Sequence, residues 1–199
     1  MRYLIRVCFT IAALAIAGSA GSAGSTGQQQ AAVVPLSYGI TELDLTGENL
    51  PGMAVFARRE NFNAHGFDVL TLYIKTSHGD GSPPVWQLVS LFNKEKEEFT
   101  ITTRVGADCL LHDFRLVTSA QSSGYQLVVA DRKLGKSYAN AAPVVFSFYD
   151  LKKNDKNLPG RPLYYFELQR SQKAKHQYCD VGEAFSKELG LKPYGEQNH

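Results

Sequence analysis

The sequence lacks the motifs of the common hydrolases and nucleotide-binding enzymes. It contains no Gly-x-Ser-x-Gly elbow, no Walker-type phosphate loop and no Cys or His cluster with zinc spacing. It also lacks the Ser-x-x-Lys pair, in which the lysine activates a serine nucleophile, and the His-x-His-x-Asp-His pattern of metallo-hydrolases. Lys75-Thr76-Ser77 partly matches a Lys-Thr-Gly triad but stands without that nucleophile. We therefore expect no enzymatic activity, no cofactor and no metal site.

Net charge is also low. The formal charge of +2 falls to zero once Arg2 and Arg6 are removed with residues 1–30, which hold no Asp, Glu or Lys. Nucleic-acid binding requires a basic stripe that neutralises phosphates. The densest lysine run, Lys152, Lys153 and Lys156, indicates a solvated turn instead. We expect no nucleic-acid partner.

The amino terminus has the layout of a secretory signal. Two arginines precede an apolar run from Val7 to Ala17, and small residues follow it. That run is shorter than the roughly 20 residues that a membrane-spanning helix needs. Cleavage after Ala20 or Ala23 leaves small residues at the recognition positions. We predict a cleavable signal peptide over residues 1–23, a disordered leader over 24–35, and one soluble domain over 36–199 in the periplasm or outside the cell.

Two cysteines remain after cleavage, Cys109 and Cys179. In an exported chain such a pair favours a disulfide over a metal site. The bridge would close a loop of about 70 residues and stabilise the fold by about 4 kcal/mol on the chain-entropy account. The alternative is two buried free thiols.

Short runs rich in β-branched and aromatic residues, separated by turn formers, predict strands along the domain. Eight or so strands at this spacing favour an all-β fold, a mainly antiparallel β-sandwich or barrel-like sheet. The predicted strands are 53–59, 66–76, 85–92, 99–104, 110–118, 125–131, 144–151 and 163–170.

Alternation within these runs predicts one buried and one solvated face. In the run 110–118, Leu110, Phe114 and Leu116 share the predicted buried face, whereas Asp113 and Arg115 lie on the other.

One short C-terminal α-helix completes the predicted fold. Asp180 and Glu183 have the spacing of a capping box, and Gly190 with Pro193 ends the helix. The apolar stripe of this helix is Ala184, Phe185 and Leu189.

The histidines give only weak indications of a metal or acid–base site. His112 and Asp113 are neighbours, but on a strand they point to opposite faces and do not converge on one ligand. His65 and Asp68 could approach each other across the turn at Gly66, although a loop histidine beside an Asx turn explains the same pattern.

The segment 58–68 joins two predicted strands and concentrates cations, amides, a histidine and aromatics. This composition predicts a ligand-contacting loop, in which an arginine pairs with a carboxylate of the ligand and the amides form hydrogen bonds to it. The alternative is a wide turn whose asparagines cap their own backbone above buried phenylalanines. The candidate ligand-binding residues are Arg58, Arg59, Asn61, Asn63, His65 and Asp68.

Residues 58–73 resemble the carbapenem self-resistance protein CarG family, and the strand over 144–149 agrees with that resemblance. The resemblance implies a periplasmic protein that protects its host from a carbapenem without destroying the drug. Protection would work by sequestration, with Arg58 or Arg59 pairing the drug's carboxylate, or by shielding cell-wall enzymes through protein–protein contact.

Three classes of function follow. The leading one is an exported, non-enzymatic resistance factor whose partner is a β-lactam of the carbapenem class or a periplasmic protein. The second is a periplasmic immunity or inhibitor protein that binds a toxin or hydrolase. The third is an enzyme with an ordered cluster around His65, Asp68 and His112. We expect no stable membrane insertion in any of them.

Overall fold

The structure is a computed structural model that describes residues 31–62, 66–77, 81–106, 109–118, 124–135 and 137–194. The expected signal peptide over residues 1–23 lies outside the described residues, as do residues 24–30 of the expected leader. In the part of the chain that is described, no helix has the length and apolar character needed to cross a membrane.

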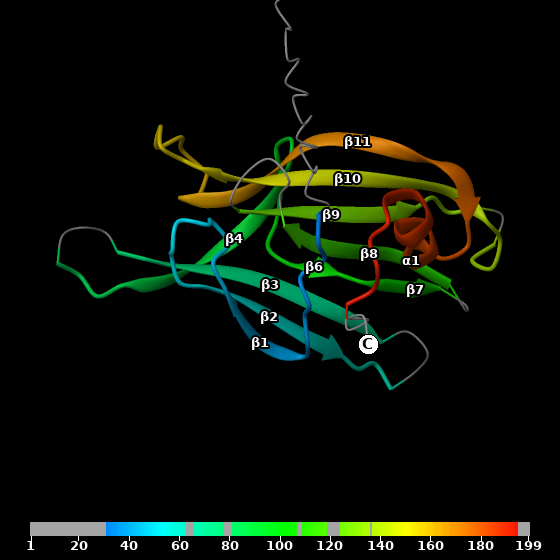
Figure 1. Ribbon diagram of the computed structural model, residues 1–199, viewed down its shortest axis with the longest axis horizontal. Helices are drawn as coiled ribbons and strands as arrows, with labels where there is room; N and C mark the ends of the chain where they lie inside the picture. The colour runs from blue at the N-terminus through cyan, green and yellow to red at the C-terminus, as the bar shows by residue number, and fades with distance from the viewer. Residues whose placement is uncertain are drawn as a thin grey trace, which may run out of the picture.

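The domain is built almost wholly from strands (Figure 1). These are β1 (Gly39–Leu43), β2 (Gly52–Arg59), β3 (Phe67–Thr76), β4 (Val85–Asn93), β5 (Lys96–Glu98), β6 (Ile101–Thr102), β7 (Arg104–Gly106), β8 (Cys109–Thr118), β9 (Tyr125–Arg132), β10 (Ala142–Lys153) and β11 (Tyr164–Tyr178).

Within the described residues, the strands form one sheet of 11 strands in the order β1-β2-β3-β4-β11-β10-β9-β8-β7, with β5 beside β4 and β6 beside β3. The β4–β11 pairing is parallel, and the other strand pairs are antiparallel. The sheet folds over at β4, so that β1–β3 form one layer and β7–β11 the other (Figure 1). The prediction of a mainly antiparallel, all-β fold with one short C-terminal helix is confirmed.

Alternating apolar residues of the two layers meet in the main hydrophobic core. Ala54 and Phe56 of β2 and Leu72 of β3 face Phe114 and Leu116 of β8 across it, and all five are buried. Because successive strand residues point to opposite sides, this period of two is what places them together.

A second core covers the outer face of β8–β10. There Val128 and Phe146 pack against Val181 and Phe185 of the C-terminal helix, and the rings of Phe146 and Phe185 lie 5.5 Å apart. The outer face of this layer is therefore apolar rather than solvated. For that reason Asp113 and Arg115, expected on a solvated face, are buried: the helix and the chain after it cover them.

The C-terminal helix consists of α1 (Val181–Ala184) and the π-helical segment η1 (Phe185–Leu189). Asp180 caps its start, as predicted, by accepting hydrogen bonds from the backbone N–H groups of Gly182 at 2.7 Å and Glu183 at 3.3 Å. The Glu183 side chain does not complete a capping box but pairs with Lys187 at 2.7 Å. Gly190 ends the helix in the left-handed region, with φ of 68°.

The predicted disulfide between Cys109 and Cys179 is present, with the two Cα atoms 5.6 Å apart. It ties the residue before the helix cap to the first residue of β8. Asp180 strengthens the same junction, because its second carboxylate oxygen accepts a 2.9 Å hydrogen bond from the N–H of Leu110.

Residues 31–34, placed by the sequence in the leader, lie along β8. The N–H of Val34 donates to the carbonyl of Leu116 at 2.8 Å, and the N–H of Thr118 donates to the carbonyl of Ala32 at 2.9 Å. The β7 strand pairs only with the opposite end of β8, so this short segment satisfies backbone groups that β7 leaves unpaired.

Two expectations from alternation are wrong. Leu110 does not share a face with Phe114, because the β7–β8 register moves from Val105↔Leu110 to Arg104↔His112 and leaves one extra residue on β8. Leu110 therefore packs toward the second core. The predicted strand 99–104 is also broken, since the chain leaves β6, which pairs with β3, to form β7 against β8.

Candidate functional site

The β2–β3 hairpin carries the residues that the sequence singled out. Arg58 pairs with Asp68 in the strand register and continues the core-facing side of Ala54 and Phe56 beyond the end of the core. Its guanidinium lies 3.4 Å from Asp68 and 3.5 Å from Glu60, and the side chain is 47% exposed. Ion pairs this long and this exposed contribute little to stability, so Arg58 can exchange partners at low cost.

Asp68 is held more firmly than Arg58. It accepts a 2.9 Å hydrogen bond from the Tyr38 hydroxyl, and its backbone N–H donates to Thr103 Oγ1 at 2.9 Å. Burial and the hydrogen bond to Asp68 raise the pKa of Tyr38, which keeps the hydroxyl a neutral donor. Tyr38 in turn stacks on Phe56, with ring centroids 5.1 Å apart. The Asp68 carboxylate therefore keeps a partner if Arg58 turns to a ligand.

Arg59 lies on the opposite side of β2. Its guanidinium sits 5.6 Å from the ring centroid of Phe67 and hydrogen-bonds to the side chain of Asn61. The two remaining candidates, Asn63 and His65, lie outside the described residues. The structure thus separates two arginines that the sequence treated as equivalent.

Arg58 and Asp68 line a groove of about 600 Å³ between the β2–β3 hairpin, the β7–β8 pair and the C-terminal helix. Its apolar wall comprises Val105, Leu110, Pro193 and Tyr194. Its polar lining comprises Thr103, Asp113, Arg115, Asp180, Glu183, Ser186 and Lys187. Of these lining residues, only Arg58 and Asp68 were candidates from the sequence. The other lining residues come from segments that are distant from them along the chain.

A buried ion pair lies at the base of this groove. Arg115 pairs with Asp113, and its Nε donates to the carbonyl of Lys192 at 2.9 Å. Its guanidinium carbon lies 4.6 Å from the Phe185 ring centroid and 4.8 Å from that of Tyr194. Burial raises the pKa of the Asp113 carboxyl, and the adjacent Arg115 opposes that shift. The arrangement fixes the helix and the C-terminal chain against β8.

His112 belongs to a different part of the molecule. Its Nδ1 lies 2.7 Å from Asp131, on the side of β8 opposite Asp113. Asp68 and His112 line different cavities, so the cluster expected around them does not form in the described chain. Within that same described chain, no group of three or more His, Cys, Asp or Glu side chains could hold a metal ion.

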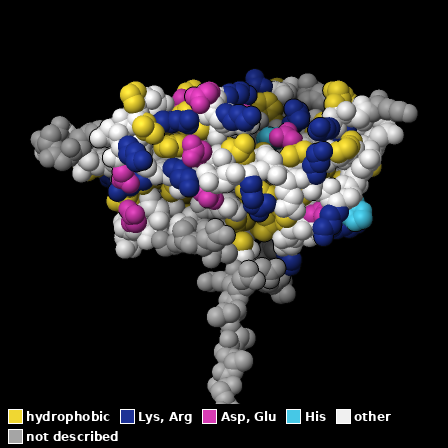
Figure 2. Space-filling model, turned by 90° about the horizontal axis from the view of Figure 1, so that it is seen from above, with side chains coloured by type: hydrophobic (Ala, Val, Ile, Leu, Met, Phe, Trp, Pro, Cys, Tyr) yellow, Lys and Arg dark blue, Asp and Glu magenta, His cyan; other side chains and the backbone are white. Residues whose placement is uncertain are grey.

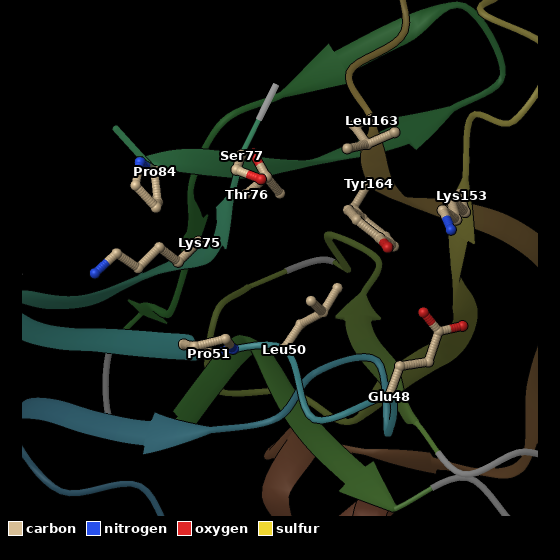
Figure 3. A pocket seen from close by; sticks show the side chains of 10 residues that line it. All are labelled: Glu48, Leu50, Pro51, Lys75, Thr76, Ser77, Pro84, Lys153, Leu163 and Tyr164. Carbon is tan, nitrogen blue, oxygen red and sulfur yellow. The ribbon is translucent and has the colours of Figure 1, made fainter. Parts of the chain in front are cut away.

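A further cavity of about 580 Å³ lies near the β10–β11 turn (Figure 3). Lys75, Thr76 and Ser77 line one side of it, and Tyr164 and Lys153 line another. Its cations are ammonium groups, which bind a carboxylate as point charges without the paired donors of a guanidinium.

The surface charge is mixed. On the face seen in Figure 2, Lys and Arg side chains are interspersed with Asp, Glu and apolar side chains rather than forming an uninterrupted basic stripe.

Known proteins resemble this chain over most of its length. Residues 36–187 match the family described as "Carbapenem resistance protein CarG-like". A solved structure described as "Crystal structure of CarG" has 25% sequence identity and a TM-score of 0.66, and the match covers 81% of this chain and 98% of that chain. Comparison with curated proteins gives no match. The resemblance inferred from residues 58–73 is thereby confirmed, and the chain belongs to the CarG-like family of carbapenem resistance proteins.

Proposed function

We propose that this protein is exported and protects its host by binding a carbapenem reversibly in the Arg58 groove, without hydrolysing the drug. Membership of the CarG-like family supplies the drug class. The observation that carries the binding site is the half-exposed side chain of Arg58 at one side of a groove that has an apolar wall.

The carboxylate of the drug would bind Arg58. A guanidinium presents paired N–H donors that match both oxygens of a carboxylate, and such bidentate contacts are stronger than neutral hydrogen bonds. Arg58 gives up two long ion pairs when it turns to the ligand. The Asp68 carboxylate still has a hydrogen-bond donor after Arg58 turns away, because it keeps the hydrogen bond from Tyr38.

The apolar part of the drug would lie against Val105, Leu110 and Tyr194. A groove of about 600 Å³ is within the range of small-molecule sites, which combine an apolar lining with a few polar groups. Phe114 packs against Tyr194, with their ring centroids 5.2 Å apart, so this apolar wall is already formed without a ligand.

The hydroxyls of the groove support binding rather than acyl transfer. A serine or threonine nucleophile needs a base within hydrogen-bond reach to activate it. Thr103 instead accepts from the Asp68 N–H at 2.9 Å, and Ser186 donates to the carbonyl of Leu191 at 3.5 Å. Lys187, the nearest ammonium along the helix, is paired with Glu183.

Isothermal calorimetry with a carbapenem tests the proposal on four proteins: the unaltered chain, Arg58→Ala, Arg59→Ala and Lys153→Ala. We expect Arg58→Ala to weaken binding at least about tenfold, because a charge-assisted contact is lost. Arg59→Ala removes the same charge one residue away and should bind as the unaltered protein does. Recovery of intact drug after incubation should be complete.

Three outcomes would overturn the proposal. Equal losses in Arg58→Ala and Arg59→Ala would mean a nonspecific charge effect. A loss confined to Lys153→Ala would place the drug in the cavity of Figure 3. Protection of a sensitive host without any measurable binding would favour the shielding of a protein partner.

A further inference from the structure

The inner face of the sheet changes from apolar to polar at one end. On β8 the inward positions run from the buried Phe114 to His112, and on β9 they run from Val129 to Asp131. On β10, Val145 is in register with Asp131, and Tyr149, which lies further along the strand and is 7% exposed, lines the same cavity. The main core therefore borders a polar cavity, because Leu91, Ile101, Val129 and Tyr149 belong both to the core and to the cavity lining.

This polar cavity has a volume of about 350 Å³, and residues of the β5 and β6 segments line one side of it. Three neighbouring strands place Arg104, His112 and Asp131 in one row, since Arg104 pairs with His112 and His112 with Asp131 in the register. Asp131 lies 2.7 Å from His112 Nδ1 and 3.6 Å from the Arg104 guanidinium. Because the carboxylate accepts from Nδ1–H, a neutral His112 keeps Nε2 as an acceptor.

The charges of the cavity balance. Lys96 is paired with Glu98 at 2.6 Å, and Arg104 is paired with Asp131. Burial, with Glu98 and Asp131 close by, raises the pKa of Tyr149 to about 12, so its hydroxyl is a neutral donor. The lining thus mixes donors and acceptors without an excess of either charge. A free anion or cation would gain no net attraction in such a site.

We propose that this cavity binds an uncharged, hydroxyl-rich ligand the size of one sugar unit. Each hydroxyl of such a ligand both donates and accepts, which suits carboxylates placed beside Arg104, His112 and Lys96. Leu91, Ile101 and Val129 provide an apolar base for the C–H groups of a sugar ring.

This polar cavity is separate from the Arg58 groove, and the two share no lining residue among those described. It does not rest on the proposed carbapenem binding, because its test is carried out without any drug.

The test is a titration of the full chain with glucose, galactose and N-acetylglucosamine, followed by saturation-transfer NMR and by the imidazole resonances of His112. Inorganic phosphate and glucuronate form the anionic arm. We expect at least one neutral sugar to saturate the site and shift His112, with phosphate without effect. Asp131→Asn and Glu98→Gln should each weaken that binding at least about tenfold, because a charged acceptor is lost.

Asp131 and Glu98 have side chains that are 53% and 46% exposed, so both variants should fold, and their circular dichroism should match that of the unaltered chain. Asp155→Asn, whose side chain is 74% exposed and remote from the cavity, removes the same charge and should bind normally. Absence of sugar binding, binding of phosphate alone, or equal losses in all three variants would overturn the proposal.

Discussion

The buried pair Asp113–Arg115 makes a quantitative prediction about stability. Arg115→Met keeps the length of the side chain but removes its charge, its contact with Asp113 and its hydrogen bond to the Lys192 carbonyl. Asp113 is 3% exposed, so the variant leaves a carboxylate buried without its cation. Removing one partner of a buried pair typically costs about 3–5 kcal/mol. We expect the free energy of unfolding at pH 7 to fall by about 4 kcal/mol.

The pH dependence gives this prediction its sharpest form. Burial already raises the pKa of Asp113, and the loss of Arg115 raises it further. A carboxyl whose folded pKa exceeds its unfolded value stabilises the fold below the unfolded pKa, and that contribution is lost as the pH rises through the folded pKa. The deficit of Arg115→Met should therefore shrink as the pH falls from neutrality toward the ordinary range of aspartate.

Urea unfolding in oxidising buffer, followed by circular dichroism at several pH values, measures the deficit. The double variant Asp113→Asn, Arg115→Met removes the stranded carboxylate and should be more stable at pH 7 than Arg115→Met by about 2 kcal/mol. A deficit below about 1 kcal/mol, which is the size of an exposed pair, would refute this reasoning. So would a deficit that stays constant with pH, or a double variant that is no more stable than Arg115→Met.

Three other variants test separate parts of the fold. Replacing Cys109 and Cys179 by Ser should lower the free energy of unfolding by about 4 kcal/mol, measured against the oxidised protein, because the unfolded chain loses a closed loop of 70 residues. Asp180→Ala should lower it by about 2–3 kcal/mol in urea, since the helix cap and the acceptor for the Leu110 N–H are both lost. The raised pKa of Tyr149, about 12, stabilises the folded state below pH 10, and this contribution is lost as the pH rises toward 12. Tyr149→Phe should therefore lose less of its free energy of unfolding between pH 10 and pH 12 than the unaltered protein does. Equal losses in the two proteins would contradict the shift.

Much of the fold follows from local patterns in the sequence. Strands β2, β3 and β4 are apolar runs rich in β-branched and aromatic residues, and they were predicted to within one residue at each end. The helix cap at Asp180 was readable because capping depends on a few neighbouring residues. By contrast, β1 and the eight residues that extend β11 beyond Arg170 carry too few apolar residues to signal a strand, and their partners across the sheet decide their structure.

The candidate site was only half readable, for a physical reason. Arg58 stands out by composition, and its parity with Ala54 and Phe56 could have distinguished it from Arg59. The other side of the groove could not be read in this way. Arg115 and Tyr194 meet only because the helix folds back over β8, and no local pattern encodes a contact across 79 positions.

The polar end of the main core was missed because alternation was used only to find buried residues. His112 follows the same period as Phe114, yet the sequence offered no sign that Asp131 would lie beside it. The neighbouring strands β8 and β9 bring them together through their register, which depends on the hydrophobic pattern of the whole sheet.

Protection of a living cell tests the central claim most directly. A carbapenem-sensitive host would express the unaltered protein, Arg58→Ala or Arg59→Ala at equal levels, and the lowest inhibitory drug concentration would be measured while intact drug in the medium is assayed. The account predicts that the unaltered protein and Arg59→Ala raise this concentration, that Arg58→Ala does not, and that the drug survives in every culture. Equal protection by all three proteins, or disappearance of the drug, would contradict it.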